Sequence, residues 1–185
     1  MEPSKNQFWN KAMFWGFIVA LATMLLTTVF YATDNFFSGA KSWIEQAILI
    51  IGIVWCTLVF KQTLGANDEF SYGRALGLGV ATSFFASLIL ALFVYVLFQY
   101  IDPDLISQTL QKTEEKLMES GLSDDMIEKQ MEMQGKFIKP AIMAASTIFS
   151  KVFMGLIFSL ITSIFLKKKA ADGFEAAMDE INDED

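Results

Sequence analysis

Residues 75–100 read ALGLGVATSFFASLILALFVYVLFQY, a run without a single charged side chain. The run lies in an interval of 27 uncharged residues, 75 to 101, that separates Arg74 from Asp102. A helix rises about 1.5 Å per residue, so about 20 apolar residues cross the roughly 30 Å hydrocarbon core of a bilayer. The interval therefore predicts a membrane-spanning helix at residues 75–100.

A second uncharged block predicts another span at residues 12–33, between Lys11 and Asp34. A cleaved signal peptide is the competing interpretation, but the block is long for one and residues 30–33 lack a small-x-small cleavage site. Of the 185 residues, 54% are hydrophobic and 18 are Phe, an apolar excess too large for a soluble domain. We expect a membrane protein that retains this first helix.

Two further blocks, at residues 43–60 and 141–166, each contain one charged side chain. Glu45 interrupts the first block and Lys151 the second, and 15 uncharged residues follow each charge, 46–60 and 152–166. Fifteen residues make about 22 Å of helix, too short to cross alone, so each block must carry its charge into the edge of the bilayer. The predicted fold is all-α, a bundle of four transmembrane helices.

Glu45 and Lys151 are predicted to lie at one depth in this bundle. Glu45 precedes Phe60 by 15 residues and Lys151 precedes Leu166 by 15, so both rise about 22 Å above the inner boundary. Lys151 can extend its ammonium group to the nearby interface on its own, or it can form an ion pair with Glu45 that links the second and fourth spans. A role of the two charges in transport is the third alternative.

Small residues recur along one side of the third span and again in the fourth. Their spacing of four residues lets helix backbones approach closely, which drives association where lipid removes the usual hydrophobic force. We expect contact within one chain, with a homodimer seam as the alternative. The candidate packing residues are Gly73, Gly77, Gly79, Ser83, Ser87 and Gly155.

Residues 102–139 predict an amphipathic helical hairpin outside the membrane, between the third and fourth spans. Asp102 and Pro103 suit a helix start, Gly121 a stop, and Ser123 a second start. Its apolar stripe either packs within the protein or docks a partner, whereas its acidic excess disfavours anionic lipid. A further segment, 170–185, carries seven acidic residues and no basic one, and is expected to form an acidic cytoplasmic tail.

Basic residues orient the spans, because Lys and Arg are retained on the cytoplasmic side. Seven of them precede the first span, separate the second from the third, or follow the fourth, whereas the first loop holds only Lys41. Segment 102–139 adds five lysines against nine carboxylates and weakens the contrast. We expect a multi-pass protein of a bacterial cytoplasmic (inner) membrane with both termini in the cytoplasm. Predicted interface anchors are Trp9, Trp15, Trp43, Lys167, Lys168 and Lys169.

Composition excludes several kinds of site. Cys56 is the only cysteine and the chain contains no histidine, which excludes disulfides within the chain, Cys/His zinc sites and histidine acid/base catalysis. No spacing brings a nucleophile beside a base, and the glycine-rich run lacks the context of a nucleotide motif. We expect no enzyme activity, catalytic residue, metal, cofactor or nucleic-acid partner.

Several local motifs occur together in this chain: Phe70-Ser71-Tyr72-Gly73-Arg74-Ala75 before the glycine-rich span, Asp102-Pro103 after it, and the Met- and Glu-rich hairpin. With these motifs the sequence resembles, from about Trp9 to Lys169, a bacterial domain-of-unknown-function family numbered 4199. The resemblance implies an integral cytoplasmic-membrane protein of unassigned activity and carries over no catalytic residues.

Two hypotheses of function follow. The first is a non-enzymatic membrane protein that acts as an accessory or scaffold component through helix–helix or hairpin contacts with a membrane-protein partner or a second copy. The alternative is a small transporter or channel, suggested by Glu45, Lys151 and the small-residue faces.

Overall fold

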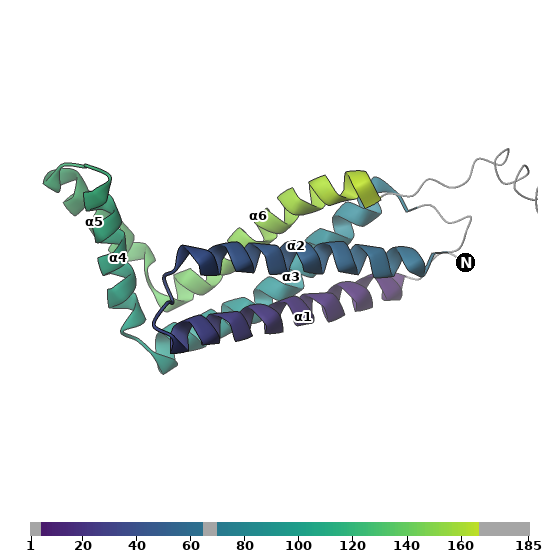
Figure 1. The fold of residues 1–185 in the computed structure, drawn as a ribbon, viewed down its shortest axis with the longest axis horizontal. Coiled ribbons are helices and arrows are strands. Elements are labelled where there is room, and N and C mark those ends of the chain that lie inside the picture. Colours follow the sequence, from purple (N-terminus) through teal and green to yellow (C-terminus); the bar gives the residue numbers. More distant parts are fainter. Residues whose placement is uncertain (1–4, 65–69, 167–185) are drawn as a thin grey trace, which may run out of the picture.

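The computed structural model describes residues 5–64 and 70–166 and shows an all-α protein. Within these ranges the chain forms six α-helices, with a short π-helical segment that extends the third (Figure 1). The elements are α1 (Lys5–Ala32), α2 (Gly39–Gln62), α3 (Tyr72–Val96), η1 (Leu97–Ile101), α4 (Leu105–Glu119), α5 (Asp124–Phe137) and α6 (Pro140–Leu166).

Four of the helices are long and apolar enough to cross a bilayer, so the protein is a multi-pass membrane protein. They are α1, α2, α3 together with η1, and α6, with mean hydropathies between 2.0 and 2.4 over their most apolar windows. The fold class predicted from the sequence is confirmed, including the two short helices between the third and fourth spans.

The ends of the spans follow from local sequence. The Ser38 hydroxyl accepts a hydrogen bond from Ala40 N at 3.3 Å at the start of α2, and Ser71 accepts one from Arg74 N at 3.3 Å at the start of α3. Pro140 begins α6, where its missing N–H costs no helical hydrogen bond. At its C-terminal end α3 continues as the π-helical turn η1, which ends at Asp102.

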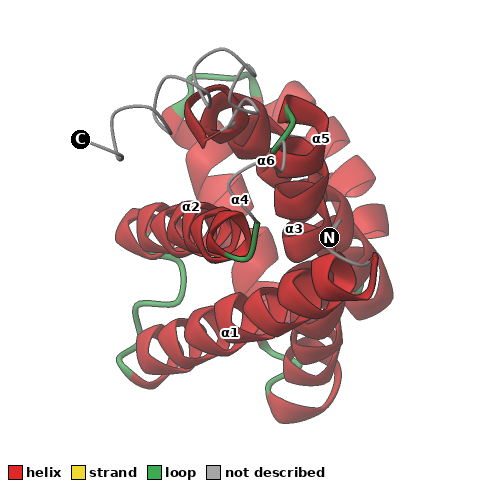
Figure 2. Cartoon of the chain, turned by 90° about the vertical axis from the view of Figure 1, so that its right-hand side faces the viewer, coloured by secondary structure: helices red, strands yellow, loops and turns green. Residues whose placement is uncertain are grey.

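Helix α3 is the central helix of the bundle. It packs against α6 and α1 along most of its length and also contacts α2, whereas α6 touches α2 only sparsely. Figure 2 shows α1 and α6 on either side of α3, with α2 across the bundle from it. Because α3 faces three neighbours, it buries residues such as Leu78, Ser83 and Ser87 on several sides.

The hairpin of α4 and α5 lies at the end of the bundle where α1 leads into α2, and it runs across the direction of the spans (Figure 1). Gly121 makes the turn between its helices with a φ of +74°, a conformation that favours glycine. Tyr31 at the end of α1 donates a hydrogen bond to Asp102 Oδ2 at 3.0 Å, and Leu105 is buried against Leu97 and Phe98. These contacts attach the base of the hairpin to the bundle.

Candidate functional site

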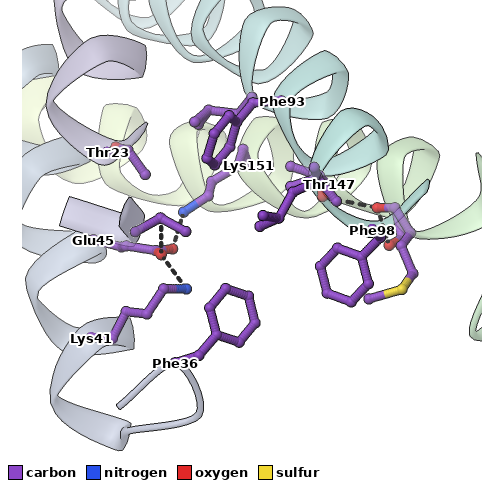
Figure 3. Close-up of a pocket in the computed structure, with 14 residues that line it drawn as sticks. Thr23, Phe36, Lys41, Glu45, Phe93, Phe98, Thr147 and Lys151 are labelled. Atoms are coloured by element: carbon purple, nitrogen blue, oxygen red, sulfur yellow. Dashed lines mark hydrogen bonds and ion pairs between the residues drawn. The ribbon is translucent and has the colours of Figure 1, made fainter. Parts of the chain in front are cut away.

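Three charged side chains meet between α2 and α6 (Figure 3). Lys151 Nζ lies 3.0 Å from Glu45 Oε2, and Lys41 Nζ lies 2.8 Å from Glu45 Oε1. The side chains are only 15–16% exposed. We call Lys41, Glu45 and Lys151 the charged triad.

The triad follows from helix geometry. Lys41 and Glu45 are four residues apart on α2 and therefore share one face of that helix. Lys151 projects from α6 at the matching level, so the structure brings together the two residues that the sequence had placed at one depth. Sequence reasoning missed Lys41, which it treated as a loop residue. The spacing of four from Glu45 was the signal that would have found it.

The triad borders a cavity of about 270 Å³ to which all four spans contribute. Thr23 and Thr27 come from α1, Thr147 from α6, and Thr27 Oγ1 donates a long hydrogen bond of 3.5 Å to Glu45 Oε1. The rest of the lining is mainly apolar and partly aromatic. It includes Phe36, Leu90, Phe93, Val94, Leu97, Phe98 and Met143.

The charges of the triad do not cancel. Two ammonium groups share the single carboxylate of Glu45, which leaves a formal charge of +1 beside the cavity. Lys41 Nζ also lies 4.8 Å from the centre of the Phe36 ring, close enough for a cation–π interaction. A ligand with one negative charge would neutralise the triad without any change in the protonation of its side chains.

A different kind of contact joins α6 to α3. A Cβ added at Gly155 would collide with the Ser83 side chain, and one added at Gly79 would lie 2.9 Å from both Ile53 Cγ2 and Ser159 Cβ. These glycines therefore set the distance between the helices. Ser83 Oγ donates to Gly79 O at 2.9 Å, which satisfies its own polar group within α3.

The predicted packing residues at the start of α3 lie in looser surroundings. No described atom lies within 4 Å of a Cβ added at Gly73, and one added at Gly77 would meet only Phe8 Cζ, at 3.6 Å. Ser87 is buried and donates to Phe84 O at 2.7 Å. The closest approach of α3 and α6 is thus at Gly79 and Gly155 and not at the GxxxG pair.

Three of the predicted interface anchors, the tryptophans, lie among the described residues. Trp9 is 50% exposed and Trp43 is 79% exposed on the surface of the helices, whereas Trp15 packs against Trp55 with ring centres 6.4 Å apart. Residues Lys167–Lys169 and the acidic segment 170–185 lie outside the described residues.

No curated protein and no solved structure matches the chain. The model of a family described as "Protein of unknown function (DUF4199)" matches residues 14–168, which is most of the 185 residues. The chain therefore belongs to the DUF4199 family of proteins of unknown function.

Proposed function

We propose that the protein is a non-enzymatic component of a bacterial cytoplasmic membrane that acts as an accessory or scaffold protein through its α4–α5 hairpin. The observation that carries this proposal is a stripe of large apolar side chains left exposed on α5. Met126, Met133 and Phe137 are 51%, 56% and 61% exposed, and we call them the α5 stripe.

The residues of the stripe lie on one side of α5 because of their spacing. Met126, Met133 and Phe137 follow one another at seven and four residues and so fall on one line along the helix. Ile127, about a quarter turn away, is buried. The hairpin thus has one apolar side turned inward and another that is open. Methionine is common at protein docking surfaces because its flexible side chain adapts to irregular shapes.

The charge of the hairpin indicates what docks there. Segment 102–139 holds nine carboxylates and five lysines, a formal charge of −4. An anionic lipid surface would repel it, whereas a protein groove with apolar walls and a basic rim would fit both the stripe and its surroundings. The proposed partner is therefore another membrane protein with such a groove.

The proposed topology places both termini in the cytoplasm and the hairpin outside. It is supported by the basic residues at the N-terminus, between α2 and α3, and after α6, which favour the cytoplasmic side. The hairpin emerges at the end of the bundle where α1 meets α2, opposite the end where α2 leads toward α3 (Figure 1).

Site-specific photo-crosslinking in native membranes tests the docking surface. A photoreactive residue at Met133 should give one discrete adduct with a second membrane protein. The matched position is Glu128, which is exposed on another side of α5 and should give none. The double variant Met126→Glu/Phe137→Glu should abolish the adduct without lowering the thermal stability of the purified protein.

Equal crosslinking from Met133 and Glu128, or none from either, would contradict the proposal. An adduct of twice the mass of the chain would assign the stripe to a second copy instead of a different partner.

A small transporter or channel is the second candidate, and the charged triad beside a cavity inside the bundle favours it. Purified protein in sealed liposomes should then conduct ions or take up solute, and Glu45→Gln should abolish the flux. Vesicles that stay sealed with the wild-type protein would exclude this candidate.

A further inference from the structure

The cavity beside the charged triad combines features that point to a ligand, independently of the proposed role of the hairpin. Lys41 and Lys151 share one carboxylate, so one positive charge is left uncompensated where both side chains are about 15% exposed. An unpaired charge in surroundings of low dielectric is costly, and an anion placed there would offset that cost.

The two ammonium groups also keep hydrogen-bonding capacity. Each lysine has three N–H donors, and among the described residues each makes one ion pair, both with Glu45. Thr23, Thr27 and Thr147 line the same cavity, but their hydroxyl groups already donate to Val19 O, Glu45 Oε1 and Met143 O, so the ammonium N–H groups are the donors open to a ligand. Carboxylate and phosphate oxygens accept several such donors at once.

The rest of the lining selects for an apolar body attached to the anion. Phe93, Val94, Leu97 and Phe98 line the cavity from α3 and η1. Its volume of about 270 Å³ is near the lower end of small-molecule sites, enough for an acidic group and the first part of a hydrocarbon chain.

The seam between α2 and α6 offers a way in. A second, more polar hollow lies there and shares Glu45, Thr147 and Lys151 with the cavity, and its lining includes the exposed Ser42 and Ser150. Because α2 and α6 touch only sparsely, a chain too long for the cavity can extend outward between them.

We propose that this cavity binds the acidic group, a carboxylate or phosphate monoester, of an amphiphile whose hydrocarbon chain lies against the aromatic lining. Lys41 and Lys151 contact the anion, and Glu45 holds the two ammonium groups in place. The triad is thus a binding site as well as a link between α2 and α6.

Full-length protein in micelles of an uncharged detergent tests the proposal with four probes. Decanoate and decyl phosphate should raise the thermal unfolding temperature in a saturable manner and give one-to-one adducts in native mass spectrometry. Decanol, which lacks the charge, and inorganic phosphate, which lacks the chain, should do neither.

Lys41→Gln is the sharpest variant, because it removes the surplus charge and keeps the 3.0 Å pair between Glu45 and Lys151. It should weaken decanoate binding by about tenfold or more, as expected for the loss of a charge-assisted contact. Lys136→Gln, at an exposed lysine of the hairpin, is the matched control and should leave binding unchanged. Val94→Phe should weaken binding by filling the cavity without altering a charge.

A comparison of phosphatidic acid with decanoate identifies the source of the ligand. Tighter binding of phosphatidic acid than of decanoate would assign the site to a membrane lipid, and the reverse order to a free acid; both support the proposal. Equal stabilisation by decanol and decanoate, equal stabilisation by inorganic phosphate and decyl phosphate, or unchanged affinity in Lys41→Gln would overturn it.

Discussion

Helix α6 meets two neighbours in two different ways. Against α3 it presents Gly155 and Ser159, and the backbones approach until an added methyl group would collide with Ser83 or with Ser159 itself. Against α2 it presents Lys151, whose partner is Glu45. Lysine and glutamate are long side chains that need room between helices, so the same pair that joins α2 to α6 also holds them apart and leaves a cavity beside the triad.

The difference teaches how association is achieved inside a bilayer. Lipid is as apolar as leucine, so close packing of small residues drives one contact and a partly buried ion pair drives the other. The α3–α6 contact is closely packed, whereas the α2–α6 contact leaves charged side chains beside a cavity. Substitutions at Gly155, Glu45 and Lys151 test whether the two contacts of α6 differ in this way.

Gly155→Val should be the most damaging change, because its branched side chain would overlap Ser83 across the closest part of the α3–α6 contact. We expect a loss of about 3 kcal/mol in the free energy of unfolding, at the upper end of the cost of overpacking. Unfolding of the purified protein in mixed micelles with increasing SDS measures it. Gly73→Ala is the control, since no described atom lies within 4 Å of the added methyl group, and it should leave stability unchanged or slightly raised.

Glu45→Gln removes the carboxylate that pairs with both lysines between α2 and α6. It leaves Lys41 and Lys151 facing each other without the carboxylate that both of them bind. Removing one partner of a fully buried ion pair costs about 3–5 kcal/mol, and the remaining exposure of this triad reduces the expected loss to about 2 kcal/mol. The same SDS titration measures it. A variant as stable as the wild type would show that the triad does not join α2 to α6.

Lys151→Met separates the two ion pairs of Glu45, because it removes the pair between α6 and α2 and keeps the Lys41–Glu45 pair within α2. The methionine restores much of the apolar volume, so the expected loss is about 1 kcal/mol, smaller than for Glu45→Gln. Combining the two substitutions in a double-mutant cycle gives their coupling energy. Additive losses would mean that the 3.0 Å contact contributes nothing to stability.

Much of the fold could be predicted because it depends on local properties of the chain. Two long uncharged runs and two runs that each contain a single charge predicted the four spans, and Gly121 and Ser123 predicted where the hairpin turns. Counting residues from the inner boundary was enough to put Glu45 and Lys151 at one height, since the rise of a helix is constant.

Other features could not be read in advance. The spacing of Gly73 and Gly77 matched a packing motif as well as Gly79 did, yet only Gly79 lies at the closest approach to α6. Which glycine meets a neighbour depends on where two helices cross, and that point is set by all their contacts together. Lys41 was missed for a related reason, because an assumed span boundary hid its position on α2.

Hydropathy and helical rise depend only on position along the chain, so they were enough to predict four spans, two short helices between the third and fourth spans, and matching heights for Glu45 and Lys151. The contacts of α3 with all three other spans, and the meeting of Lys41, Glu45 and Lys151 beside one cavity, became visible only in the folded protein. The rotation of each helix about its axis chooses which residues face inward. That rotation is fixed by side chains from distant parts of the chain fitting against one another, and not by any single segment.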